Sequence, residues 1–268
     1  MTGATVIPQI FPRPPALIGH RGLGKGEVSG HLENTLGSFL GALDAGIHWV
    51  EVDVQRSIDD ELFVKHDAAF GSGAFLAEMT GAEASRHGAL RITELLEALP
   101  DDAGVVFDVK SSLEDATRPA DATTAALLAR IGTASLRRRP TVATSFDPAA
   151  LRHMRDLSPS LPLGLLTWLH FPIGQAVAAA AHLDVQVLSV HAGSLWPTTA
   201  VPLKDVPSVE RIVDQVHQSR RQLLVWCPTQ EQAVSLAAAG VDALVVDAVP
   251  SHVSALGETG GRWSGGLE

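Results

Sequence analysis

The sequence has very little cysteine, no long apolar run and no excess of positive charge, and each shortage excludes a class of protein. Cys227 is the only cysteine, so no internal disulfide can form, and a reducing compartment is expected. No apolar stretch reaches the roughly 18 residues that a membrane-spanning helix needs. Residues 1–15 lack the basic start and continuous apolar run of a signal peptide. We therefore expect a soluble cytoplasmic protein.

Acidic residues outnumber basic ones, which gives the chain a net charge of -10. Nucleic acids and anionic membranes attract positive surfaces, so neither is an expected partner. A small anionic ligand would have to be bound by local positive charge or by a metal ion, because the overall field repels it.

Short runs rich in β-branched residues alternate with Ala- and Leu-rich runs along the 268 residues. Several of the former are almost wholly apolar, which is typical of strands covered on both faces. Eight strands with helices between them predict one (β/α)8 TIM barrel domain over 1–268, with its core at about 16–250. The predicted strands cover 16–20, 49–54, 104–110, 141–145, 161–166, 185–190, 222–227 and 243–247. The predicted helices lie near 34–46, 92–99, 118–132, 147–157, 172–183, 208–219 and 229–239, and the run GGRWSGG near the C-terminus is expected to be a tail.

One further strand-like run, ELFVKHD at 61–67, breaks the alternation. Only about six residues separate it from the strand at 49–54, whereas a parallel crossover needs a dozen or more. The turn-forming residues Ser57, Asp59 and Asp60 lie between them. We therefore expect a β-hairpin insertion after strand two, whose second strand returns antiparallel.

Carboxylates gather at the predicted ends of strands two and three, and barrel enzymes place their active sites at the carboxyl ends of strands. Glu51 and Asp53 are two apart, so their side chains share a face, and Asp108 and Lys110 repeat this spacing. A single such carboxylate is more often a cap or an ion pair, but several directed into a barrel are costly unless a cation binds them. Three together predict an oxygen-rich site for Mg²⁺ or Ca²⁺ rather than zinc, with Lys110 able to meet a phosphate oxygen.

Other polar and aromatic residues follow the remaining strands. His20 and Arg21 end strand one, and His66 ends the returning hairpin strand. Histidine suits proton transfer because its ordinary pKa of about 6.5 lies near working pH. For Trp226, a place in the core and a place in a substrate wall are equally consistent with the sequence. Cys227 is expected to be a small buried residue, since no partner base is indicated.

These residues belong to an ordered set of motifs. In chain order the motifs are IGHRG (18–22), ENT (33–35), VEVDVQRSIDDELFVKHD (50–67), FDVK (107–110), SFD (145–147) and LVVDAVP (244–250). A lone HRG would be weak evidence, but the ordered set closely resembles the glycerophosphodiester phosphodiesterase family over nearly the whole chain.

The resemblance implies a reaction and a set of site residues. The reaction is metal-dependent hydrolysis of a small-molecule glycerophosphodiester to sn-glycerol 3-phosphate and an alcohol. His20 and His66 would be the general acid and base, in either order. The remaining expected site residues are, for phosphate or substrate, Arg21, Lys110, Glu33 and Trp226 and, for one divalent cation, Glu51, Asp53 and Asp108.

The chain departs from the family pattern in three places, which bear on its substrate range. Asp108 stands where Glu is usual, the link at 23–32 is longer, and the segment at 68–90 is shorter and lacks the usual arginine. A lysophospholipase D-like or cyclising activity on lysolipids could use the same residues, and a large apolar acceptor surface would favour it. Loss of a catalytic histidine would favour a non-catalytic barrel that binds metal or phosphate, but both histidines are present.

Overall fold

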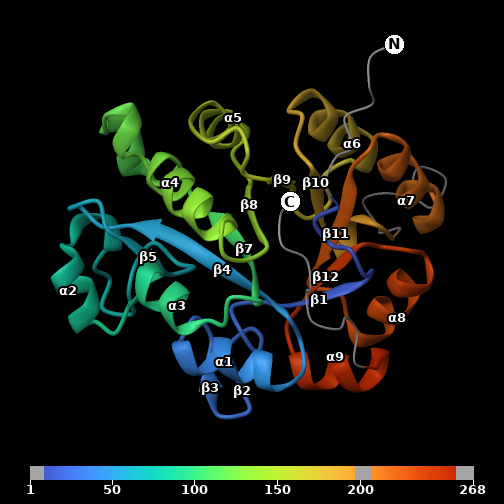
Figure 1. The fold of residues 1–268 in the computed structure, drawn as a ribbon, viewed down its shortest axis with the longest axis horizontal. Helices are drawn as coiled ribbons and strands as arrows, with labels where there is room; N and C mark the ends of the chain where they lie inside the picture. Colours follow the sequence, from blue (N-terminus) through green and yellow to red (C-terminus); the bar gives the residue numbers. More distant parts are fainter. Residues whose placement is uncertain (1–8, 197–206, 258–268) are drawn as a thin grey trace.

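The structure, a computed structural model, describes residues 9–196 and 207–257. Within them, eight parallel strands close into the predicted (β/α)8 barrel (Figure 1). The first strand closes the ring, because Ile18 pairs with Val245 on one side and with Trp49 on the other. The barrel strands are β1 (Ala16–Gly19), β4 (Trp49–Arg56), β7 (Gly104–Val109), β8 (Thr141–Ser145), β9 (Leu163–Leu166), β10 (Val187–His191), β11 (Gln222–Trp226) and β12 (Ala243–Val246).

Helices cover the outside of the barrel (Figure 1), and each predicted helical region contains one. Asp147 caps the fifth helix by accepting a hydrogen bond from Ala149 N, and Pro148 opens it. The fourth helix begins only after Thr123, whose side chain caps it, because Ala120–Ala122 form a separate 3₁₀ turn. The helices around the barrel are α1 (Leu36–Asp44), α3 (Ile92–Ala98), α4 (Thr124–Leu136), α5 (Pro148–Leu157), α6 (Ile173–His182), α7 (Val209–Gln218), α8 (Gln230–Ala238) and the unpredicted α9 (Val249–Leu256).

The hairpin insertion after the second barrel strand is confirmed. β5 (Leu62–Val64) runs antiparallel to β4, with Val54 opposite Val64. Smaller elements that the sequence does not predict lie in two connections, the one between β1 and α1 and the one between β5 and α3. They are β2 (Glu27–Val28) and β3 (His31–Leu32) before α1, and η1 (Leu76–Glu78), α2 (Gly81–Arg86) and β6 (Leu90–Arg91) after β5.

The interior of the barrel is apolar at one end and charged at the other. Phe11 packs edge-on against Trp49 with ring centroids 5.0 Å apart, and both are buried. Val106 continues the apolar interior, and Asp53 and Asp108 then face each other in register on β4 and β7. The strands thus carry their carboxylates to the end where the connecting loops can form a site.

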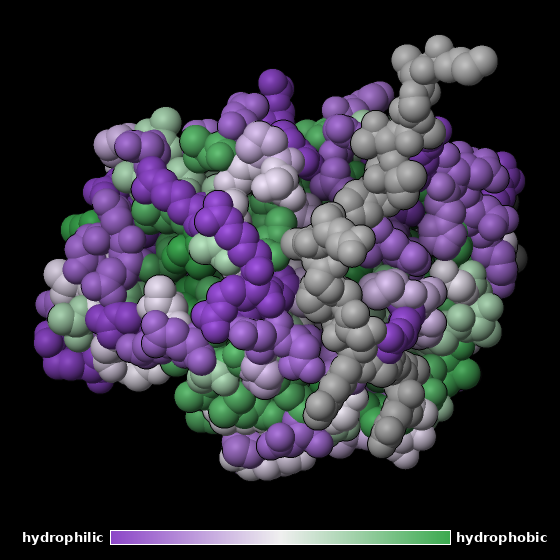
Figure 2. Space-filling view, viewed as in Figure 1, coloured by the Kyte–Doolittle hydropathy of each residue, from purple (hydrophilic) through white to green (hydrophobic). Residues whose placement is uncertain are grey.

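The outer surface follows the amphipathic pattern of the helices. Figure 2 shows hydrophilic residues over the outer side of α7, whose apolar residues Ile212, Val213 and Val216 are buried. In 9–196 and 207–257, no helix combines the length and the hydrophobicity required to cross a bilayer. The tail predicted at GGRWSGG lies outside the described residues.

Candidate active site

A cavity of about 340 Å³ opens at the carboxyl ends of the barrel strands. Seven of the nine predicted site residues line it, whereas Asp53 and Glu33 do not. Its walls are formed by His20, Arg21, Glu51, His66, Val106, Asp108, Lys110, Thr144, Phe146, Leu166, Trp168, Ser189, Leu224, Trp226 and Val245.

Three carboxylates meet at one side of this cavity. Glu51, Asp53 and Asp108 are all buried, and they offer oxygen atoms that lie within 4.8 Å of one another. The strand spacing explains the arrangement, since Glu51 and Asp53 share the inner face of β4 and Asp108 lies beside them on β7.

Two cations partly neutralise this acidic cluster. Lys110 Nζ lies 2.9 Å from Asp53 Oδ1 and also contacts Asp108 Oδ2, and Arg21 Nε lies 3.4 Å from Asp53 Oδ2. Although burial favours the neutral acid, Lys110 and Arg21 hold the pKa of Asp53 below its usual value. Asn34 Nδ2 also donates a hydrogen bond of 2.9 Å to this carboxylate. Asp53 is therefore the carboxylate of the cluster whose charge is best compensated.

The other two carboxylates are less well compensated, although Lys110 also contacts Asp108. Burial and the neighbouring Asp53 raise the pKa of Glu51 to about 8, and burial also raises the pKa of Asp108. Within the described residues, the buried Asp108 Oδ1 accepts no hydrogen bond. Negative charge in excess of its counter-ions, presented by oxygen atoms alone, fits a hard divalent cation such as Mg²⁺ or Ca²⁺.

Arg21 is held in place from several directions. Its backbone has a φ of 55°, in the left-handed region, and its N–H donates a 3.0 Å hydrogen bond to Glu51 Oε2. Its guanidinium donates a 2.6 Å hydrogen bond to Glu33 Oε1, and the second oxygen of Glu33 accepts from Gly26 N. Glu33 therefore orients Arg21 and ties down the loop above it, while only Arg21 faces the cavity.

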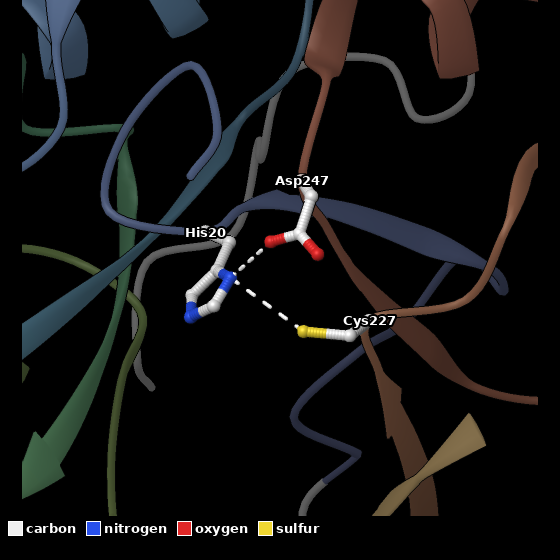
Figure 3. A group of neighbouring side chains, drawn as sticks. All are labelled: His20, Cys227 and Asp247. Atoms are coloured by element: carbon white, nitrogen blue, oxygen red, sulfur yellow. Dashed lines mark hydrogen bonds and ion pairs between the residues drawn. The ribbon is translucent and has the colours of Figure 1, made fainter. Parts of the chain in front are cut away.

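His20 is flanked by an acid and a thiol that enter from distant parts of the chain (Figure 3). Its Nδ1 is hydrogen-bonded to Asp247 Oδ1 and lies 3.7 Å from Cys227 Sγ, while Nε2 lies 3.9 Å from Glu51 Oε2. Burial alone would lower the pKa of His20, but Asp247, Cys227 and Glu51 together raise it to about 10. The same contact with His20 lowers the pKa of Asp247 despite its burial.

His66 approaches the cavity from the hairpin insertion. Gln55 Nε2 donates hydrogen bonds of 3.0 and 2.7 Å to the carbonyls of Lys65 and His66, which fixes the backbone where β5 ends. The His66 Nδ1 lies 2.8 Å from Asp67 Oδ1, and 40% of its side chain is exposed. The antiparallel return of β5 thus brings the second histidine to the same cavity as His20.

Aromatic rings form the opposite wall of the cavity. Phe146 stacks on Trp168 with centroids 4.2 Å apart, and Trp226 meets Phe146 edge-on at 6.0 Å. Trp168 is 65% exposed, so this apolar wall continues to the rim. Trp226 Nε1 and Ser189 Oγ are buried without a hydrogen-bond partner in 9–196 and 207–257, so both can bind a polar group that enters the cavity.

Two features of the site do not follow from the sequence pattern. Asp247 lies within the motif LVVDAVP but is given no role there, although it is the partner of His20. The prediction that Cys227 is a buried residue without a partner base is wrong, because Cys227 is only partly buried and lies beside His20 Nδ1. The register of β1 with β12 explains the contact between His20 and Asp247. Gly19 pairs with Val246, so the next residue of each strand lies beside the other.

Residues 20–250 match the model of the glycerophosphoryl diester phosphodiesterase family. A glycerophosphocholine phosphodiesterase of Schizosaccharomyces pombe is 38% identical over 108 residues, which are 39% of this chain but only 9% of that relative. A glycerophosphodiester phosphodiesterase from Thermotoga maritima superposes with a TM-score of 0.70, at 20% identity over 90% of this chain and 97% of that one. An Oleispira antarctica phosphodiesterase in complex with the product sn-glycerol-3-phosphate gives a TM-score of 0.69, at 22% identity over 90% and 96%. The two structures establish a shared fold, and the family match over most of the sequence shows that this chain belongs to the glycerophosphoryl diester phosphodiesterase family.

Proposed function

We propose that this chain hydrolyses glycerophosphodiesters to sn-glycerol 3-phosphate and an alcohol, in a reaction that depends on a divalent cation. The observation that carries the proposal is a cavity lined by Arg21, by the two histidines and by Glu51 and Asp108 of the acidic cluster. The names of the relatives agree with it, since one is a glycerophosphocholine phosphodiesterase and another is a phosphodiesterase in complex with sn-glycerol-3-phosphate.

The charged wall of the cavity, which comprises Arg21, Lys110 and the acidic cluster, would bind the phosphate. Glu51, Asp53 and Asp108 would hold the cation, which when bound supplies positive charge for the phosphate oxygens. Arg21 is already oriented by Glu33, so it can meet a phosphate oxygen without rearranging. Lys110 lines the cavity beside the carboxylates and adds a second fixed positive charge.

The two histidines would transfer the protons, because the Nδ1 atom of each is hydrogen-bonded to a carboxylate. Asp247 on His20 and Asp67 on His66 can only accept, so each ring keeps its hydrogen on Nδ1 and leaves Nε2 for exchange with substrate. One histidine takes the proton of the nucleophile and the other gives a proton to the departing alcohol. The nucleophile is either water or the neighbouring glycerol hydroxyl, and the second route passes through a cyclic phosphate that product analysis would detect.

The test is release of sn-glycerol 3-phosphate from glycerophosphocholine and glycerophosphoethanolamine, with Mg²⁺, with Ca²⁺ and with a chelator. We expect cation-dependent release that falls by about 10² or more in His20→Ala and in His66→Ala. His182→Ala, at an exposed position on α6, is the matched control and should keep full activity. Folded protein that releases no product with either cation would exclude the proposal, as would a histidine variant of unchanged turnover.

A second candidate substrate class is favoured by the apolar wall. Phe146, Leu166 and Trp168 line the cavity, and the adjoining Leu169 is 47% exposed at the rim. Such a surface could accommodate the acyl chain of a lysophospholipid, whose phosphodiester would meet the same charged wall. Comparison of lysophosphatidylcholine with glycerophosphocholine separates the two: Trp168→Ala should lower kcat/KM for the lysolipid alone if the wall binds an acyl chain.

A further inference from the structure

A second group of metal-ligating side chains meets at Nδ1 of His20, whereas Nε2 of the same ring faces Glu51 of the acidic cluster. His20, Cys227 and Asp247 offer a nitrogen, a sulfur and an oxygen atom that lie within 4.8 Å of one another (Figure 3). They follow β1, β11 and β12, so three neighbouring strand ends bring them together. Neither Cys227 nor Asp247 lines the cavity in which the substrate would bind.

We propose that His20, Cys227 and Asp247 form a Zn²⁺ site, separate from the acidic cluster, and that Zn²⁺ bound there inhibits the enzyme. Zinc favours nitrogen and sulfur ligands, whereas the acidic cluster offers oxygen alone. The two sites thus differ in ligand chemistry, which allows a soft and a hard cation to bind side by side.

The spacing of the atoms fits tetrahedral zinc. Zinc bonds of about 2.3 Å to sulfur and about 2.0 Å to nitrogen place those two ligand atoms about 3.5 Å apart in a tetrahedron. Cys227 Sγ and His20 Nδ1 are 3.7 Å apart, so neither side chain has to move far. The Asp247 carboxylate is in direct contact with Nδ1 and would turn outward to admit the ion.

The backbone and the surroundings support an accessible site. Cys227 has a φ of 53°, and its N–H donates a 2.9 Å hydrogen bond to Val245 O, which fixes the turn that carries the thiol beside His20. The Asp247 side chain is 37% exposed, so water can reach the ion and fill the fourth position. Binding would release the thiol proton and the Nδ1 proton, leaving Zn²⁺ balanced by one thiolate and one carboxylate.

Inhibition follows because His20 would be both a zinc ligand and one of the two histidines that transfer protons. This step rests on the proposed function. With zinc on Nδ1, Nε2 retains its hydrogen and no longer exchanges it near neutral pH. The ring also loses its hydrogen bond to Asp247. His20 could then neither accept nor donate a proton at the substrate, although the acidic cluster would still hold its own cation.

Cobalt substitution tests the site without relying on catalysis. Metal-free protein titrated with Co²⁺ should develop thiolate-to-cobalt charge-transfer absorption, since Cys227 is the only thiol in the chain. The absorption should be absent in Cys227→Ser and should persist in Asp53→Asn, which alters the acidic cluster but none of the three proposed zinc ligands. Folded wild-type protein without this absorption would overturn the proposal, whether or not the protein hydrolyses diesters.

Zinc inhibition and thiol protection supply the second test. At saturating Mg²⁺, the half-inhibitory Zn²⁺ concentration should rise at least about tenfold in Cys227→Ser. In the wild type, one equivalent of Zn²⁺ should protect Cys227 from alkylation, which also decides the matter if the serine variant does not fold. Equal zinc inhibition of wild type and variant, or alkylation that zinc does not slow, would refute the site.

Discussion

Binding of Mg²⁺ should expel a proton from Glu51. The pKa of this carboxyl is raised to about 8 by burial and by Asp53, so the protonated form predominates in the metal-free protein at pH 7. A carboxylate must be ionised to bind a metal, so binding and deprotonation are coupled. We expect close to one proton released per Mg²⁺ at pH 7, and an affinity for Mg²⁺ that rises from pH 6 to pH 8.

The same shift predicts how stability depends on pH. The folded chain keeps the Glu51 proton up to a pH of about 8, whereas the unfolded chain loses it near the ordinary pKa of 4.5. The folded state therefore binds more protons between these limits, and the free energy of unfolding of the metal-free protein falls as pH rises through them. The full shift corresponds to roughly 5 kcal/mol as an upper bound. Mg²⁺ should oppose this loss, because it stabilises the ionised form.

Calorimetric titration of Mg²⁺ in two buffers of different ionisation enthalpy measures the proton release directly. Glu51→Gln should remove both the released proton and the decline in stability, while Glu231→Gln, at an exposed position on α8, should change neither. Mg²⁺ binding with no proton release, together with a pH-independent affinity, would show that Glu51 is ionised in the metal-free protein and would refute the reasoning.

Three further predictions concern the support of the site. Asp247→Asn should lower kcat by about 10²-fold and shift the pH profile while Mg²⁺ affinity stays unchanged, because the residue acts through His20; a parallel fall in affinity would contradict this. Glu33→Gln should raise KM about tenfold with little change in kcat, since Arg21 loses a charge-assisted hydrogen bond. Gly22→Ala should lower the free energy of unfolding in denaturant by at least about 3 kcal/mol, because the added Cβ would lie 2.6 Å from Ser38 C. Gly26→Ala, also at positive φ but in open space, should lower it by about 1 kcal/mol. Equal losses in the two variants would refute the steric argument.

The barrel could be predicted because its strands carry a local signature. The eight strands are short and separated by helical segments, and several of them are almost wholly apolar. The hairpin at 61–67 follows from a connection too short for a crossover. The acidic cluster could also be anticipated, because Glu51 and Asp53 share a strand face and Asp108 lies on the next strand. The elements that were missed, such as α2 and β6, contain only 6 and 2 residues and carry little periodic signal.

The partners of His20 could not be predicted in the same way. His20 and Asp247 are separated by 227 positions in the sequence, and they meet only because β1 and β12 close the ring. Cys227 joins them through the register of β11 with β12. Local sequence patterns do not encode such register, and the same limit applies to Glu33, whose contact with Arg21 depends on a loop conformation.

The two walls of the cavity should control different properties of the enzyme, one the binding of the cation and the other the choice of substrate. The charged wall, built by β1, β4 and β7, holds every carboxylate of the acidic cluster, whereas Phe146, Leu166 and Trp226 line the opposite side. In the proposed reaction the phosphate faces the first wall, which would direct the departing alcohol or the glycerol toward the second. Phe146→Leu should therefore change the ratio of kcat/KM between choline and ethanolamine diesters by several-fold, about 1 kcal/mol for a lost aromatic contact, and leave Mg²⁺ affinity intact. Asp108→Asn should weaken Mg²⁺ binding and lower turnover on both substrates alike. If Phe146→Leu lowered both substrates equally, or Asp108→Asn altered their ratio, the separation of the two walls would be wrong.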